Sequence, residues 1–215
     1  TCALPISGEL ARALLLSAHY RSILDFGEDS IEQALTALGR IYECKAKALE
    51  LSQKKSAVPD MRAESLWGEF VQDCEKTRGQ MLDAMANDFN TPEVFGAVFA
   101  LIREFNRVAA EPLAQATPSA VLGAQAFLNL LELDLGELLG IGRLEPTKAL
   151  EDLSRIRAAR SGSRVSPEEI ASLIAERLQA RKDKNFARAD EIRKDLDSKG
   201  VVLKDGPQGT TWEYR

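Results

Sequence analysis

A stripe near the C-terminal end of the chain combines an aromatic ring with two opposite charges. Phe186, Asp190 and Arg193 are spaced i, i+4 and i+7, so a helix would place them along one side. An exposed ring can stack on an unpaired base, while a carboxylate and a guanidinium can hydrogen-bond to base edges. The spacing is therefore compatible with recognition of single-stranded RNA.

The same residues also have a purely structural interpretation. Phe186 could pack at the rim of a core, and Asp190 with Arg193 could form an i, i+3 pair worth about 0.3 kcal/mol. Arg181, which would project near the same shoulder from the end of the preceding helix, could stabilise the dipole of that helix. Spacing alone favours this structural interpretation. Trp212, on an expected strand, is likewise more typical of a core than of a nucleotide platform.

Two helices and a hairpin must position these side chains. The first helix is expected to begin after its N-cap Ser166, and the second to extend from about residue 185 to residue 199. Gly200 ends the second helix, and two short strands joined by a turn at residues 205–209 follow it. The helix face that must meet the hairpin carries Ala189, Ile192 and Leu196. Residues 166–215 are therefore predicted to form a helix–helix–hairpin module.

The chain before this module has the pattern of a helical bundle. Apolar residues recur at helical spacing in five segments, and no segment shows a convincing strand alternation. The expected N-caps are Asp29, Thr91 and Thr117, and a proline follows each threonine. The first helix is expected to end near Arg21. Residues 8–145 are therefore predicted to form a five-helix bundle, which makes the fold class mainly α with a small α+β module.

Residues 146–165 are predicted to be a solvated linker between the helical bundle and the C-terminal module. Five cations lie between Lys148 and Arg164 against two carboxylates, Glu151 and Asp152, and large apolar side chains are few. Because a segment without an apolar stripe has little to pack with, we expect this linker to be mobile.

Composition excludes several classes of protein. The 215 residues carry 28 Lys and Arg against 33 Asp and Glu, and the net charge of −5 excludes a strongly basic nucleic-acid coat protein. The longest apolar run, nine residues from Val94 to Ile102, is shorter than the roughly 20 residues that span a membrane. No secretory signal opens the chain, so we expect a soluble, cytoplasmic protein.

Few residues could support independent catalysis. The chain has one histidine, His19, and three widely spaced cysteines, which are too few for a zinc site or a histidine-based triad. Two other polar and aromatic clusters, at residues 19–21 and 88–91, are interpreted as helix ends and caps. No catalytic or metal-ligating residue is therefore expected in this chain.

Three segments resemble a known family. The C-terminal half of the bacterial cysteinyl-tRNA synthetases is similar, in this order, to the segments LLLSAHYRSILDF, AMANDFNTPEVFGAVFALIREFNR and IAERLQARKDKNFARADEIRKDLDSKGVVLKDGPQGTTWEYR. The last segment is the most specific. The resemblance implies a class I aminoacyl-tRNA synthetase with a DALR-type helical bundle against the tRNA and a C-terminal module that reads the anticodon.

The resemblance also implies which residues contact RNA. It places the anticodon-recognising positions of the family on Arg181, Phe186, Asp190, Arg193 and, at the hairpin turn, Asp205. Phe186 stands where a tryptophan is common in the family. Since spacing had grouped all but Asp205 independently, the RNA-binding interpretation becomes the preferred one.

Other features of the family have no counterpart in this chain. Its HIGH-type and KMSKS-type ATP motifs and its zinc ligands do not match any segment, so ATP and zinc are implied only for the full-length enzyme. We expect a fragment that is inactive alone, with tRNA(Cys) and an N-terminal catalytic domain as partners, and a monomer. At the start of the predicted bundle, the sequence GELAR at residues 8–12 stands where the family usually has an Ala-Leu-Arg signature. The role of Arg12 is therefore open.

Two alternatives stay open. A cysteine ligase of mycothiol synthesis resembles the synthetase, but that family lacks the anticodon module, so the tail of this chain argues against it. The other alternative is a free-standing helical domain that binds RNA or protein without any role in a ligase.

Overall fold

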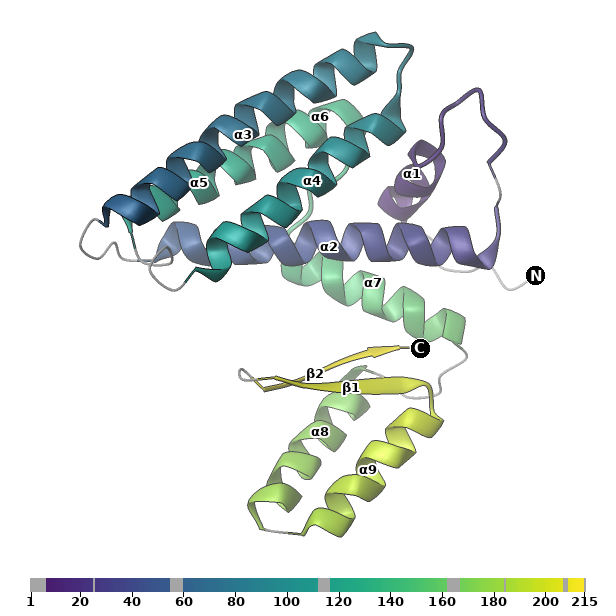
Figure 1. Ribbon diagram of the computed structural model, residues 1–215. Helices are drawn as coiled ribbons and strands as arrows, with labels where there is room; N and C mark the ends of the chain where they lie inside the picture. The colour runs from purple at the N-terminus through teal and green to yellow at the C-terminus, as the bar shows by residue number, and fades with distance from the viewer. Residues whose placement is uncertain are drawn as a thin grey trace. The chain divides into compact units, whose positions relative to one another are not determined.

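Two units make up the computed structural model, a helical unit at residues 7–150 and a C-terminal unit that begins at residue 151 (Figure 1). The described residues are 7–24, 26–54, 60–111, 117–161, 167–183, 185–206 and 209–214, of which 161, 167–168, 205–206, 209 and 213–214 are described by their backbone alone. The predicted fold class, mainly α with a small α+β module, is confirmed. None of the described helices is both long and apolar enough to cross a lipid bilayer.

The helical unit is built from successive helices. They are α1 (Gly8–Leu16), α2 (Glu28–Gln53), α3 (Met61–Ala86), α4 (Thr91–Ala110), α5 (Pro118–Asn129), the π-helix η2 (Leu130–Leu135) and α6 (Gly136–Leu139). α3 packs against α4 and α5, and α2 packs against α1 and α5 (Figure 1). The fifth predicted helix corresponds to α5, η2 and α6, and it begins as expected after the N-cap Thr117. It ends at Gly140, whose φ of 67° lies in the left-handed region that favours glycine.

Four buried aromatic rings form the centre of the helical unit. Trp67 and Phe70 of α3 make an edge-on contact with centroids 5.6 Å apart, while Phe105 of α4 stacks on Phe127 of α5 at 4.6 Å. Gly123 of α5 lies against the Trp67 ring. A Cβ atom on Gly123 would lie 2.9 Å from Trp67 Cζ3 and still closer to Cε3. Glycine therefore permits an approach of α5 to α3 that alanine would block.

Two of the predicted N-caps differ from the observed ones. α2 begins after Gly27 rather than at Asp29, because Ser30 Oγ accepts a hydrogen bond from Gly27 N (3.0 Å) and donates one to Gly27 O (2.8 Å). α4 has Asn90 as its N-cap rather than Thr91, since the Asn90 side chain accepts a hydrogen bond from a backbone N–H of the first turn. In both helices the observed cap precedes the expected one, Gly27 by two residues and Asn90 by one.

α1 is shorter than predicted and ends at Leu16 instead of near Arg21. The Ser17 hydroxyl donates to Leu14 O (2.7 Å), and the Thr91 hydroxyl donates to Leu16 O (2.8 Å). These bonds satisfy carbonyl groups at the end of the helix, although the residues that follow favour helix. A partner 75 positions away along the chain thus overrides local propensity.

The predicted linker is helical over most of its length. Residues Pro146–Ser161 form α7, while residues 162–166, and with them the predicted N-cap Ser166, lie outside the described part of the chain. The buried residues of α7 are Ala149, Leu153 and Ile156. Their i, i+4, i+7 spacing is a helical stripe of only three apolar residues, which the surrounding cations obscure in the sequence. The segment is thus a helix with a buried face rather than the solvated chain that its composition indicates.

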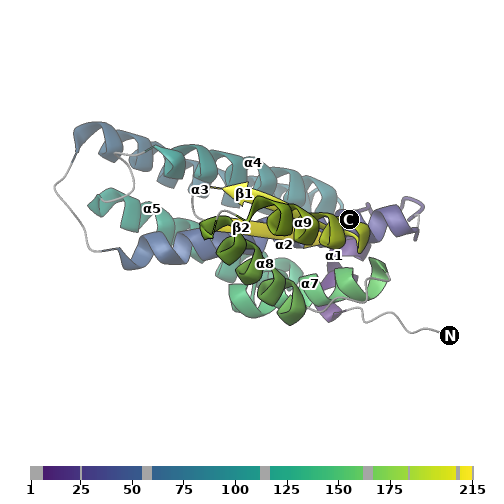
Figure 2. The same ribbon diagram turned by 90° about the horizontal axis from the view of Figure 1, so that it is seen from below.

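The C-terminal unit has the predicted order of two helices and a hairpin. α8 (Pro167–Lys182) and α9 (Phe186–Ser198) lie side by side, and β1 (Val201–Gly206) pairs antiparallel with β2 (Gly209–Tyr214) (Figures 1 and 2). The predicted apolar face of α9 is buried, and two of its residues belong to a core of Ile170, Ile192, Leu196, Val201 and Leu203. Gly200, with φ of 79°, separates α9 from β1 as expected.

Candidate nucleic-acid interface

The start of α9 is fixed by its cap and by its short connection to α8. Asn185 is the N-cap, and its side chain accepts a hydrogen bond from Arg188 N (3.2 Å). The Asn185 N–H donates to Ala180 O near the end of α8 (2.8 Å). These bonds place Phe186 at the first position of α9. Its ring is 60% exposed to solvent.

Asp190 and Arg193 lie on the side of α9 that borders strand β1. Both side chains are exposed, and they line one hollow of about 340 Å³. The other residues of this hollow are Lys194, Asp197, Val201, Val202 and Leu203. The hollow therefore combines carboxylate acceptors, cationic donors and apolar strand residues. An unstacked base can use this combination, because its edge forms hydrogen bonds while its faces need apolar contact.

Phe186 does not line this hollow, but it precedes Asp190 by about one turn on the same side of α9. The structural interpretation of the stripe requires a packed ring and an ion pair between Asp190 and Arg193. The ring is exposed instead, and no ion pair joins these two side chains in the described part of the module. The geometry therefore leaves an aromatic face, an acceptor and a donor open to a ligand.

Arg181 and Asp205 complete the predicted set. Arg181 has an exposed side chain in the last turn of α8, and the short connection to α9 keeps it at the same end of the helix pair as Phe186. Asp205 pairs through the backbone of β1 with Thr210 of β2, but its side chain lies outside the described residues. The structure thus brings four of the five predicted residues to α9 and the adjoining end of α8.

Arg188 holds α9 against α8. Its guanidinium forms ion pairs with Glu176 of α8 (2.8 Å) and with Glu191 of α9 (2.7 Å). These ion pairs orient α9 and involve neither Asp190 nor Arg193, so they leave the candidate site accessible.

Arg177 has a role that the sequence pattern does not reveal. It continues the stripe of Ile170 on α8, and it is buried, with Nη1 donating to Thr210 Oγ1 of β2 (3.4 Å). An arginine on an otherwise apolar stripe marks the position as unusual, but the sequence does not identify Thr210 as its partner. Trp212 lies opposite Leu203 and packs partly buried against the core of the module, in line with its interpretation as a core residue.

Two family models match separate parts of the chain. Residues 80–143 match the DALR domain, which here extends from the second half of α3 to the loop after α6. Residues 165–212 match the cysteinyl-tRNA ligase anticodon binding domain, which includes α8, α9 and most of the hairpin.

Curated relatives align with almost the whole chain. The cysteine–tRNA ligase of Geobacter metallireducens is 39% identical over 207 residues, that of Pelobacter propionicus 36% over 212, and that of Maridesulfovibrio salexigens 37% over 211. The alignments cover 95–96% of this chain but only 41–42% of each relative. The chain contains a cysteinyl-tRNA ligase anticodon binding domain and is similar over nearly its whole length to cysteine–tRNA ligases. It corresponds to the C-terminal part of these ligases, which confirms the resemblance seen in the sequence.

The start of the chain has a structural role although it departs from the usual signature. Arg12 Nε donates to Gly140 O at the end of α6 (3.1 Å). Glu9 is only 6% exposed, and its carboxylate accepts hydrogen bonds from Tyr42 OH (2.7 Å) and Gly142 N (2.7 Å). These bonds attach α1 to the loop after α6 and give Arg12 the role that the sequence leaves open.

Lys45 of α2 extends this buried network. Its ammonium donates to Gly142 O (2.8 Å) and Leu144 O (2.9 Å). It also pairs with Glu132 of the π-helix η2 (2.8 Å). Burial, followed by the hydrogen bond to the neighbouring carboxylate, raises the pKa of Tyr42, which therefore stays a neutral donor. Since each named group has a partner within the fold, we assign the network to stability.

The two polar clusters interpreted as helix ends meet in space. Tyr20 OH donates to Asp88 Oδ1 (2.6 Å), Arg21 Nη2 pairs with the same oxygen (3.2 Å), and the His19 ring stacks on Tyr20 at 4.8 Å. The cluster fixes the turn between α3 and α4. Among the described residues no group of three His, Cys, Asp or Glu could hold a metal ion.

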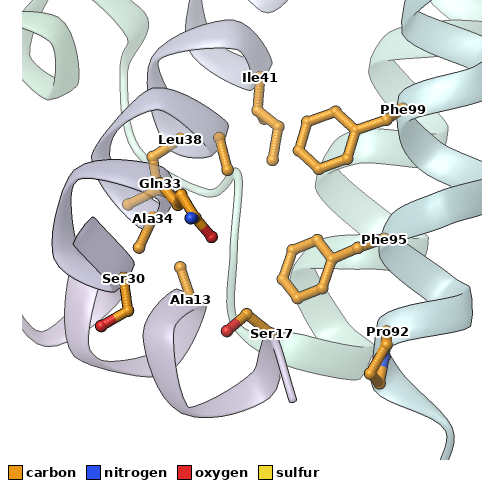
Figure 3. Close-up of a pocket in the computed structure, with 11 residues that line it drawn as sticks. Ala13, Ser17, Ser30, Gln33, Ala34, Leu38, Ile41, Pro92, Phe95 and Phe99 are labelled. Atoms are coloured by element: carbon orange, nitrogen blue, oxygen red, sulfur yellow. The ribbon is translucent and has the colours of Figure 1, made fainter. Parts of the chain in front are cut away.

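An apolar cavity of about 180 Å³ lies between α1, α2 and α4 (Figure 3). Phe95 and Phe99 of α4 point into it and stack with centroids 6.2 Å apart, while Arg40 lies over the Phe99 ring at 4.9 Å. Its polar lining residues are Ser17, Ser30 and Gln33. Since the residues that line it are mostly apolar, we assign the cavity to helix packing.

Proposed function

We propose that this chain recognises tRNA(Cys) for a cysteine–tRNA ligase and that its C-terminal unit binds the anticodon. One observation carries the proposal: an exposed Phe186 ring adjoins the hollow of Asp190 and Arg193, within the segment that matches the anticodon binding domain. Phe186 stacks on an anticodon base, while Asp190 and Arg193 hydrogen-bond to base edges. Arg181 and Asp205 provide further polar contacts.

Stacking and base-edge hydrogen bonds supply most of the affinity in this proposal. Residues 166–215 hold ten Lys and Arg against ten Asp and Glu, so the module has no net charge with which to attract phosphates. Few phosphate contacts imply a shallow dependence of affinity on salt concentration. Sequence-selective contacts therefore matter more for this module than general attraction to RNA.

We further propose that the full-length ligase joins cysteine to tRNA(Cys) with ATP and that an N-terminal catalytic domain supplies this chemistry. Zinc does not fit the described residues of this chain, which offer no cluster of three ligating side chains. The domain organisation in the proposal is a tRNA-binding bundle at residues 8–145 and an anticodon module at residues 166–215. We infer that the protein is a monomer and acts in the cytoplasm.

The chain alone is expected to show no cysteine-dependent exchange of pyrophosphate into ATP, because its sequence contains neither of the family's ATP motifs. The assay uses purified chain supplied with zinc, and a protein-free sample sets the background. Exchange above that background would refute the assignment of catalysis to another part of the ligase.

Phe186→Ala is expected to weaken binding of tRNA(Cys) by about 1–3 kcal/mol, the range for losing one base–aromatic stack. The unfolding midpoint should stay unchanged, since the ring is exposed and lies off the buried face of α9. Phe186→Trp should bind as well as or better than the original chain. Binding and unfolding are measured on the same samples, by fluorescence anisotropy of labelled tRNA and by denaturation.

Phe26→Ala is the matched control, because Phe26 is also a phenylalanine 60% exposed but lies in the helical unit. The affinity of the Phe26→Ala variant for an isolated anticodon stem–loop of tRNA(Cys), which contacts only the anticodon module in this proposal, should not change. Equal losses for both variants would indicate a general effect of surface apolarity. A large loss of stability in Phe186→Ala, with unchanged affinity per folded molecule, would show that Phe186 is a core residue and would end the stacking proposal.

A further inference from the structure

Arg177 of α8 carries a positive charge into the interior of the C-terminal unit. It is only 3% exposed, and it follows Ile170 and Ile174 on the side of α8 that packs against the core of the module. Taking a guanidinium out of water carries a desolvation penalty even when the group is hydrogen-bonded. An apolar residue at position 177 would continue the stripe without that penalty. Packing alone therefore does not explain the arginine.

The Arg177 guanidinium reaches the hairpin next to its turn. Nη1 donates to Thr210 Oγ1, at a distance of 3.4 Å. Thr210 is the second residue of β2 and lies two positions before Trp212, which packs against the core. Because side chains two positions apart share one side of a strand, the Thr210 hydroxyl also lies on the side that faces the helices. Arg177 thus joins α8 to the turn end of the hairpin.

Thr210 is the cross-strand neighbour of a residue that the proposed function assigns to RNA. In the antiparallel register of the hairpin, Asp205 of β1 pairs through its backbone with Thr210 of β2. A displacement of Thr210 therefore displaces the backbone of Asp205 with it. The place of Asp205 depends in this way on the bond that Arg177 makes.

The opposite end of the hairpin is fixed by apolar contacts instead. The core of the module joins β1 to α9 through Val201, Leu203, Ile192 and Leu196. A two-stranded hairpin is at best marginally stable by itself, so its turn end needs a further contact to keep one position. A directional hydrogen bond from Arg177 selects that position, whereas an apolar contact would allow the strands to slide.

We propose that Arg177 is a positioning residue for recognition of the anticodon, and that it holds the turn end of the hairpin where Asp205 can reach its base. The proposal rests on the proposed function, in which Asp205 contacts the anticodon. Arg177 is buried, so it acts through the hairpin and not by touching RNA. Its loss should therefore depend on Asp205 and be independent of the Phe186 stack.

The test is a double-mutant cycle on the binding of an isolated anticodon stem–loop of tRNA(Cys) to this chain. Arg177→Met keeps an unbranched, apolar side chain and removes the donor. We expect Arg177→Met alone to weaken binding about threefold to tenfold, the effect of losing one hydrogen bond. In an Asp205→Ala background the same substitution should change the affinity by less than about twofold, because coupled residues are not additive. In a Phe186→Ala background the two losses should multiply.

Thr210→Val tests the same bond from its other end. Thr210 is only half-buried, so valine replaces its hydroxyl without disturbing the core. The variant should reproduce both the weaker binding and its dependence on Asp205. Thr211→Val is the matched control, because Thr211 is exposed and its hydroxyl donates to Lys204 O within the hairpin (3.3 Å). Its affinity for the stem–loop should not change.

Amide hydrogen exchange on the same samples separates positioning from folding. Protection of the amides in α8 and α9 should be the same in Thr210→Val as in the original chain. Loss of this protection in both Arg177→Met and Thr210→Val would assign the bond to the stability of the module and would overturn the proposal. Losses of affinity that multiply between Arg177→Met and Asp205→Ala would overturn it as well.

The failure of the proposed function would give a different result. If Phe186→Ala and Asp205→Ala bound the stem–loop as tightly as the original chain, the anticodon would not bind at this site and both proposals would fail. If these two variants bound more weakly but Arg177→Met and Thr210→Val did not, only the positioning role of Arg177 would be refuted.

Discussion

Gly123→Ala is expected to lower the free energy of unfolding of the helical unit by about 3 kcal/mol, the upper part of the usual range for overpacking a core. The added Cβ would overlap the Trp67 ring, with Cδ2 and Cζ3 at 3.0 and 2.9 Å and Cε3 nearer still. The ring has little room to move, because it is fully buried and makes edge-on contacts with Phe70 and Phe105. α5 must therefore shift away from α3.

Gly68→Ala is the matched control for this substitution. Gly68 also lies within a helix, but a Cβ there would meet no atom within 4 Å. Alanine should therefore raise stability by about 0.5–1 kcal/mol through its better helix propensity. Trp67 fluorescence in a Trp212→Phe background reports unfolding of the helical unit alone. Similar stabilities for both variants would show that the close approach of α5 to α3 is not required.

Glu9→Ala is expected to destabilise the helical unit by about 2–6 kcal/mol, because two buried donors lose their acceptor and each costs about 1–3 kcal/mol. These donors are Tyr42 OH and Gly142 N, both 2.7 Å from Glu9 Oε1. Glu9→Gln keeps one carbonyl oxygen and should lose less. Denaturant unfolding, followed as for Gly123→Ala, measures the difference.

Glu43→Ala is the control for Glu9→Ala, since Glu43 is exposed on α2. Its effect should be within about 0.5 kcal/mol, as for most surface substitutions. If Glu9→Ala were equally mild, the buried network would contribute nothing to stability and Arg12 alone would attach α1 to the loop after α6.

The C-terminal module could be predicted from sequence because its signals are local. Asn185 precedes α9, Gly200 follows it, and the alternating residues of the hairpin come directly after. The stripe that begins at Phe186 follows from helical spacing alone. Asp205 does not, since its assignment depended on the resemblance to the family.

Other features of the fold escaped prediction because they depend on contacts between distant segments. The end of α1 is set partly by Thr91, 75 positions away, and no pattern within α1 contains that information. The helix at residues 146–161 has only three buried apolar residues among many cations, so composition obscures it. The link from Arg177 to β2 likewise requires knowing which strand crosses α8.

The bond between Glu9 and Gly142 joins residues 133 positions apart, and this separation has a consequence for synthesis. A ribosome adds about 5–20 residues per second, so roughly 10 s pass between the two residues. During that interval Glu9 and Arg12 lack their partners in the loop after α6. Helix α1 is therefore synthesised well before the loop that fixes it, and it cannot take its final place until residue 142 has emerged.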